Sequence, residues 1–309
     1  MDQHSLQASG RSYEVLRAAR HESVRLRTLE AHVRRWGPEA PPVVLLHGFQ
    51  DTGDTFQFMV DAFDRDWPLA APDWRGFGRS EWAREGYWFP DYLADLDALL
   101  DLLSPQEPVR LIGHSMGGNI ACMFAGLKPH RVRCVVNLEG FGLPRTSAEE
   151  APARLRNWLD QVRAVPALKS YESFEQLASV IRHRYPRFSL VQARFVAEAW
   201  GRVEADGRVH LLGDSRHRWI NPVLYRREEA EACWRAIRAP VLMLKGQESE
   251  FVTRLGADGT DDAFRAQVRG IEIAHVAGAG HMLHIEKAAE IAPLIETFLL
   301  AHSPPSLCP

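Results

Sequence analysis

The segment that most constrains the fold is a pentapeptide at residues 113–117, which reads Gly-His-Ser-Met-Gly. It follows the strand-like run 109–112 and precedes a helical pattern over 118–128, so a strand must turn into a helix within a few residues. We expect Ser115, at the turn, to have a strained backbone, and glycine at 113 and 117 to avoid clashes with the neighbouring chain. The serine hydroxyl would then lie above a sheet edge, beside a helix N-terminus whose backbone donors favour negative charge.

Apolar runs alternate with helical patterns on both sides of this turn. The other strand-like runs lie at residues 42–46, 67–72, 134–138, 240–244 and 271–276. The clearest helical pattern spaces Tyr92, Leu96 and Leu99 along one face and places aspartates on the other. Strands that alternate with helices form β-α-β units. The chain is therefore expected to belong to the α/β class, with a parallel sheet covered by helices on both faces.

The middle of the chain departs from this alternation. Residues 143–235 lack continuous β-branched runs, and three segments look helical, near 150–165, 171–183 and 188–200. Because the strands resume at residue 240, we interpret 143–235 as a mainly helical cap, or lid. It divides an α/β core into residues 1–142 and 236–309. The tail from Ser303 onward is expected to be unstructured.

Composition excludes several classes of protein. The 309 residues include 37 Lys and Arg and 40 Asp and Glu, a net charge of −3 without the basic excess that nucleic-acid binding needs. The four cysteines form no C-x-x-C pair, and the segment Met1–Gly10 has no apolar run of the signal-peptide kind. No stretch approaches the roughly 18 apolar residues of a membrane helix. We expect a cytoplasmic protein with no nucleic-acid or membrane partner, no cofactor and no metal; the oligomeric state is left open.

A serine hydroxyl is a weak nucleophile and needs a base. His281 lies on a glycine-rich stretch, residues 278–282, between the last strand-like run and the terminal helix. It is the candidate base. His284, three residues later, is expected to pack or support, since an H-x-x-H pair is poor evidence for a metal site without a third ligand.

Several motifs in order along the chain resemble the α/β-hydrolase superfamily. The likeness is to its lidded branch, which includes serine hydrolase-like proteins, epoxide hydrolases and haloalkane dehalogenases. The matching motifs are His-Gly-Phe at 47–49, Asp-Trp-Arg-Gly-Phe-Gly-Arg-Ser at 73–80, the turn at 113–117 and Gly-His at 280–281. The resemblance implies a mostly parallel eight-stranded sheet with the cap inserted after the sixth strand. It also implies an oxyanion hole formed by the backbone N–H groups of Phe49 and Met116.

The acid that would orient His281 departs from the family pattern. The resemblance places an aspartate in a G-x-x-D stretch after the seventh strand, but residues 246–249 read Gly-Gln-Glu-Ser. Glu139 is the preferred candidate, because it ends the sixth strand, beside the strand that leads to Ser115. Glu248 is an alternative acid and Glu250 a weaker one.

Other polar residues are expected to have structural roles. Asp73 and Arg75 are expected to pair and brace the turn at 76–78, and His47 to hold its own loop. Asp51 and Asp54 could cap the following helix. Most of the tryptophans and phenylalanines of the cap are expected in its core, with a few lining an apolar pocket between cap and sheet.

The function favoured by the sequence is a cofactor-independent serine hydrolase that cleaves an ester or similar acyl bond through an acyl-enzyme on Ser115. Its substrate is expected to be small and apolar or aromatic. Epoxide and haloalkane chemistry is disfavoured, because it requires an aspartate nucleophile in place of the serine. Two alternatives stay open. One is a cofactor-free dioxygenase, or another non-hydrolytic enzyme, that uses the His281–carboxylate pair. The other is a ligand-binding protein that retains a hydrolase pocket.

Overall fold

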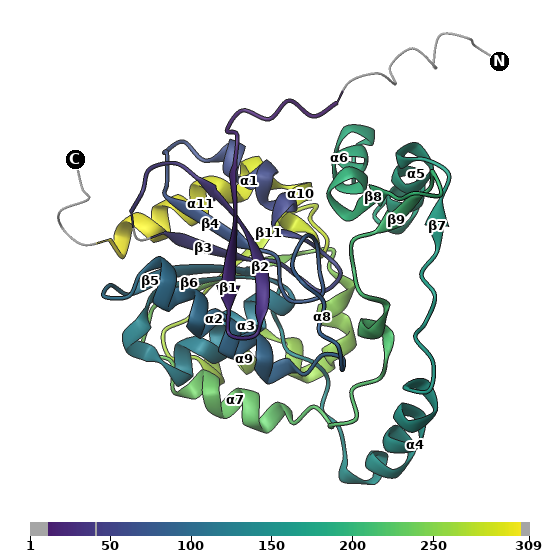
Figure 1. Ribbon diagram of the computed structural model, residues 1–309. Helices are drawn as coiled ribbons and strands as arrows, with labels where there is room; N and C mark the ends of the chain where they lie inside the picture. Colours follow the sequence, from purple (N-terminus) through teal and green to yellow (C-terminus); the bar gives the residue numbers. More distant parts are fainter. Residues whose placement is uncertain (1–11, 41, 304–309) are drawn as a thin grey trace.

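The computed structural model describes residues 12–40 and 42–303, so the expectations for Met1–Gly10 and for the tail beyond Ser303 fall outside the described residues. Its centre is an eight-stranded sheet, in the order β1-β2-β4-β3-β5-β6-β10-β11 (Figure 1). The strands are β1 (Arg20–Leu26), β2 (Leu29–Trp36), β3 (Val43–Leu46), β4 (Leu69–Pro72), β5 (Val109–His114), β6 (Val132–Leu138), β10 (Val241–Gly246) and β11 (Glu272–Val276). Only β2 runs antiparallel to its neighbours in this sheet, which confirms the α/β class and the mostly parallel sheet.

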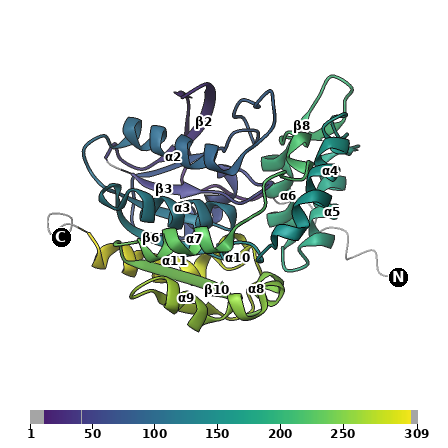
Figure 2. The same ribbon diagram turned by 90° about the horizontal axis from the view of Figure 1, so that it is seen from below.

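Helices cover both faces of this sheet, as the alternation of patterns predicts (Figures 1 and 2). One face is packed by α1 (Gln57–Ala62) and α11 (Ala288–Ala301), and the other by α2 (Phe89–Leu103), α3 (Met116–Leu127), α7 (Arg227–Arg235) and α9 (Asp261–Gln267). In α2 the predicted apolar face is confirmed, since Tyr92, Leu96 and Leu99 are buried. Among the described residues, no helix is long and apolar enough to span a membrane.

Short 3-10 helices connect several of these elements. They lie at Gly53–Phe56, Pro129–Arg131, Ala148–Glu150, Ser215–Arg218 and Gly256–Gly259. Two short α-helices, α8 (Glu250–Leu255) and α10 (Leu283–Glu286), follow β10 and β11 at the carboxyl edge of the sheet. Ligand sites of open α/β sheets lie outside the carboxyl ends of the strands. This edge is therefore where the site is expected.

Between β6 and β10 the chain forms a separate group of elements beside the main sheet (Figure 1). These are α4 (Ala151–Gln161), β7 (Ser170–Tyr171), α5 (Phe174–Arg184), α6 (Leu190–Trp200), β8 (Gly201–Val203) and β9 (Val209–Leu211). The three helices match the three predicted segments, whereas the small antiparallel sheet β7-β9-β8 was not predicted. Its strands have two or three residues each, too few to show an alternating pattern.

The cap has its own apolar core, which also contacts the main domain. Leu177 and Val196 of the cap share a cluster with Phe58 of α1 and Ile285 of α10. The last part of the segment predicted as cap behaves differently, because Ala230 and Trp234 of α7 belong to the core cluster that includes α3. The structure thus places α7 with the helices of the main domain.

Two predicted polar contacts are wrong. Asp73 does not pair with Arg75: its carboxylate accepts from Arg34 Nη1 at 2.7 Å, while Arg75 pairs with the buried Asp95 at 2.6 Å. Asp54 pairs with Arg34 instead of capping a helix. The reason is Arg34, a buried guanidinium on β2 that the sequence does not mark as buried and that requires carboxylate partners.

The loop that contains the His-Gly-Phe motif is held as predicted. His47 is fully buried, and its Nε2 accepts from the backbone N–H of Trp74 at 2.8 Å while Nδ1 lies 2.7 Å from the Gly48 carbonyl. Burial lowers the pKa of His47, which favours the neutral ring that this pair of bonds requires. His47 therefore fixes the backbone on either side of the motif.

Candidate active site

Ser115 occupies a strained turn between β5 and α3. Its backbone has φ 51° and ψ −114°, a region that non-glycine residues rarely adopt. A β-carbon at position 113 would overlap the carbonyl of Gly117, and one at position 117 would overlap the carbonyl of Leu46. Strain of this kind persists only where the surroundings enforce it, and it is common at reacting residues. The strained strand-to-helix turn predicted at residues 113–117 is thus present in the structure.

His281 lies within hydrogen-bond distance of this serine. It follows β11 in the loop before α10, and its Nε2 is 3.0 Å from Ser115 Oγ. On the other side of the ring, Nδ1 is 3.2 Å from Oε2 of Glu139. A carboxylate can only accept, so Nδ1 carries the hydrogen and Nε2 presents its lone pair to the serine hydroxyl. This is the tautomer that a general base requires.

Glu139 is held rigidly at the end of β6. Its side chain is fully buried, its φ is 60°, and Oε1 accepts from the backbone N–H of Gly246 at 2.6 Å. Asn137 clamps the turn by accepting from Gly140 N at 2.7 Å and donating to Gly140 O at 2.9 Å. Ser249, at the position where the family pattern has an aspartate, donates its hydroxyl to Oε2 of Glu139. The serine therefore supports the carboxylate of the adjacent strand.

The two alternative acids lie elsewhere. Glu248 forms an ion pair with Arg187 of the cap and is about half exposed. Glu250 is largely exposed, with Arg254 as its partner at 3.7 Å. The structure brings Glu139 to His281 and brings neither of these two carboxylates there.

The backbone groups expected to form the oxyanion hole lie beside Ser115. Met116 is the first residue of α3, where a backbone N–H has no acceptor within its own helix. The loop that carries Phe49 passes close by, since a β-carbon at Gly48 would lie 3.2 Å from Cβ of Ser115. The ring of Phe49 is half exposed and packs edge-to-face on Phe77. The oxyanion role of both N–H groups stays a prediction.

Two features around His281 were missed by the sequence analysis. Phe251 of α8 stacks on the imidazole, with ring centroids 3.9 Å apart and planes at 20°. Behind the histidine, Nε2 of the buried His114 lies 2.9 Å from the His281 carbonyl oxygen. Burial lowers the pKa of His114 well below its ordinary value, and the neighbouring His284 and His281 lower it further. No spacing in the sequence signals either contact, because α8, the end of β5 and the loop of His281 are separate segments that the fold brings together.

Comparisons with known proteins agree with this fold. A family model described as the alpha/beta hydrolase fold matches residues 41–288. The chain is 28% identical over 278 residues to a serine hydrolase-like protein of Danio rerio, covering 87% of this chain and 85% of that protein. It is 30% identical over 240 residues to a 3-hydroxybutyrate-oligomer hydrolase of Cupriavidus necator, covering 71% and 77% respectively. The thioesterase domain from the curacin biosynthetic pathway superimposes with a TM-score of 0.80 at 24% identity, covering 91% of this chain and 99% of that domain.

Proposed function

This chain belongs to the α/β-hydrolase family, and we propose that it is a serine hydrolase that cleaves an ester or similar acyl bond through an acyl-enzyme on Ser115. The observation that carries the proposal is the continuous chain of contacts from Ser115 Oγ through the His281 ring to the buried Glu139. The hydrolase names of its relatives from Danio rerio and Cupriavidus necator support hydrolysis as the reaction.

In the acylation step, Ser115 Oγ attacks the substrate carbonyl carbon while His281 Nε2 removes the hydroxyl proton. The carbonyl oxygen becomes negatively charged and accepts hydrogen bonds from the backbone N–H groups of Phe49 and Met116. His281 is then positively charged, and Glu139 stabilises that charge through Nδ1–H. When the tetrahedral intermediate collapses, the C–O bond to the alcohol breaks and the alcohol leaves with the proton from Nε2.

Deacylation uses the same groups in the same order. Water takes the place of the alcohol, and His281 Nε2 removes its proton as the water oxygen attacks the acyl carbon. Collapse of the second intermediate returns the proton to Ser115 Oγ and releases the carboxylic acid. Ser115 and His281 are thus restored after each turnover.

The proposed substrate is small, with an apolar or aromatic group beside the reacting carbonyl. Phe251 stacks on His281, and Phe49 follows the glycine that passes beside Ser115. Both rings are large and apolar, yet 42% and 48% exposed. Burying such surface against an apolar group of a substrate is favourable by about 25 cal/mol per Å². An ester bond is also what the name of the Cupriavidus necator relative, a 3-hydroxybutyrate-oligomer hydrolase, denotes for that protein.

The test is hydrolysis of chromogenic p-nitrophenyl esters with short, medium and long acyl chains. Ser115→Ala should abolish hydrolysis. Ser23→Ala is the control: it removes an exposed serine hydroxyl distant from Ser115 in the chain and should leave hydrolysis unchanged. Glu248→Gln tests the alternative acid and should also be unchanged. If Ser115→Ala hydrolyses every ester as fast as the wild type, the proposal is wrong. Oxygen consumption with aromatic substrates, in the absence of ester hydrolysis, would instead favour the dioxygenase alternative.

A further inference from the structure

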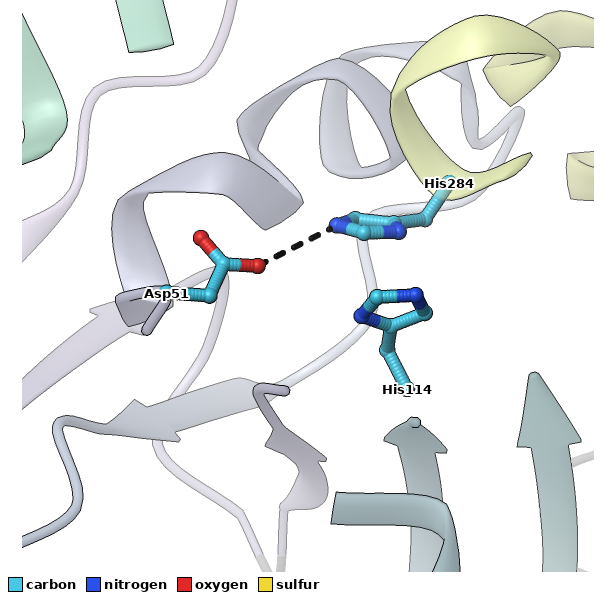
Figure 3. Close-up of side chains that lie close together, drawn as sticks. All are labelled: Asp51, His114 and His284. Carbon is cyan, nitrogen blue, oxygen red and sulfur yellow. Dashed lines mark ion pairs between the residues drawn. The ribbon is translucent and has the colours of Figure 1, made fainter. Parts of the chain in front are cut away.

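Three buried side chains from separate segments converge on one another (Figure 3). Asp51 lies in the loop after β3, His114 ends β5, and His284 lies in α10. One nitrogen or oxygen atom from each lies within 4.8 Å of those of the other two. Asp51 Oδ2 and His284 Nε2 are 3.7 Å apart, too far for a good hydrogen bond. Two ligands of one tetrahedral zinc ion are separated by roughly 3.5 Å, given bonds of about 2.0–2.2 Å.

The tautomer of His114 leaves a lone pair facing this cluster. Its Nε2 is 2.9 Å from the His281 carbonyl, which only accepts, so Nε2 carries the hydrogen. Nδ1 is therefore unprotonated, and it is buried without a hydrogen-bond partner in the described part of the chain. The backbone of Gly48 packs beside this nitrogen, and a β-carbon at that position would lie only 2.8 Å from it. A histidine that donates its other ring N–H to a backbone carbonyl is oriented as metal-bound histidines usually are.

Asp51 is oriented by neutral donors. Its carboxylate accepts from the backbone N–H of Thr52 at 2.8 Å, from Thr55 Oγ1 at 3.0 Å and from Trp200 Nε1 of the cap at 2.8 Å. These donors fix the carboxylate but bring no positive charge. Within the described residues, its ion-pair partner is His284 at 3.7 Å, whose Nδ1 is itself buried and unpartnered. A buried carboxylate of this kind is stabilised by a cation.

We propose that Asp51, His114 and His284 bind a divalent transition-metal ion of the zinc class, through one carboxylate oxygen and two imidazole nitrogens. Nitrogen and oxygen ligands without a thiolate suit Zn²⁺, and three protein ligands leave a fourth position for water. In the sequence, the H-x-x-H pair of His281 and His284 includes no third metal ligand. The fold excludes His281, which faces Ser115, and supplies His114 and Asp51 in its place. The site is independent of the proposed ester chemistry, although His114 contacts the backbone of His281.

The test is zinc binding by the full chain after chelator treatment, measured by titration calorimetry and by metal analysis after dialysis. We expect one zinc ion per chain in the wild type. Asp51→Asn and His284→Gln keep side-chain size, and each should weaken binding by about tenfold or more. His275→Asn is the matched control: it removes another histidine paired with an aspartate, at 2.8 Å and on the surface, and should keep the zinc ion.

A fourth variant separates this site from the catalytic one. His281→Gln should also keep the zinc ion. The proposal is overturned if His281→Gln loses the zinc ion while Asp51→Asn and His284→Gln retain it. It is also overturned if the wild type binds no zinc. Should the cluster variants fail to fold, anomalous scattering at the zinc edge from wild-type crystals still decides: density between Asp51, His114 and His284 supports the site, and density elsewhere refutes it. Ester hydrolysis measured on zinc-free protein tests the proposed function separately.

Discussion

Replacing Glu139 by glutamine should abolish most of the catalytic activity, and an added aspartate at position 249 should restore part of it. Ser249 donates its hydroxyl to the same Glu139 oxygen that lies 3.2 Å from His281 Nδ1. An aspartate at 249 would extend a carboxylate from the same β-carbon toward that position. The double variant Glu139→Gln with Ser249→Asp therefore carries the acid on the loop after β10, where the family pattern has it.

The expected magnitudes follow from the role of the acid. Glu139→Gln removes the charge that stabilises the protonated His281 and permits the wrong tautomer, which should cost about 10³ to 10⁴ in kcat. That loss corresponds to roughly 4 to 5.5 kcal/mol in the activation free energy. The double variant should recover about tenfold or more over Glu139→Gln, at least about 1.4 kcal/mol. Ser249→Asp alone places two carboxylates in contact, so like-charge repulsion should destabilise the folded state.

The assay is kcat/KM on the best p-nitrophenyl ester, with urea unfolding curves to show that each variant is folded. Two outcomes would refute the reasoning. A folded double variant no faster than Glu139→Gln would mean that position 249 does not reach His281. A Glu139→Gln variant within about twofold of the wild type would mean that Glu139 does not orient the base at all.

Three further predictions concern the elbow, the buried ion pair and the ring on the base. Gly117→Ala places a β-carbon against the Leu46 carbonyl and should cost about 3 kcal/mol of stability or more, measured by urea unfolding; a loss below about 1 kcal/mol would contradict the tight turn. Burial alone would raise the pKa of Asp73, but Arg34 and its hydrogen bonds hold it well below its usual range. Asp73 therefore stabilises the folded state at pH values above its unfolded pKa of about 3.9, and this contribution is lost as the pH falls below that value. Asp73→Asn should lower the free energy of unfolding at pH 7 by roughly 3 kcal/mol and make the melting temperature less dependent on pH in the acid range. Phe251→Ala removes the ring stacked on His281 and should lower kcat by about two- to tenfold, since such contacts contribute about 0.5–1.5 kcal/mol; an unchanged kcat with a raised KM would assign Phe251 to substrate binding alone.

The main domain was predictable because its signals are local. In the turn at 113–117, glycine is required at 113 by the backbone of Gly117 and at 117 by the Leu46 carbonyl of β3. The strand runs are long enough to stand out as apolar stretches. Glu139 was preferred as the acid because β6 lies beside β5, and the structure brings this residue to His281. That adjacency was implied by the resemblance to the α/β-hydrolase superfamily, because β-α alternation alone does not fix which strands are neighbours in a sheet.

What was missed depends on contacts between distant segments. Arg34 lies on a strand with ordinary alternation, and only the packed fold shows that it is buried and draws Asp73 away from Arg75. The positive φ of Glu139 and the cluster of Asp51, His114 and His284 likewise have no signal in spacing. The cap sheet was missed because its strands are shorter than the pattern needed to detect them.

The central claim is that Ser115 is a nucleophile activated by His281 and Glu139, and the most direct test is labelling with a fluorophosphonate followed by intact-mass analysis. This reagent phosphonylates a serine only when a base makes its hydroxyl reactive. The wild type should gain the mass of one adduct, Ser115→Ala should gain none, and Glu139→Gln should react much more slowly. A folded wild type that stays unlabelled, or that is labelled equally in Ser115→Ala, would contradict the claim.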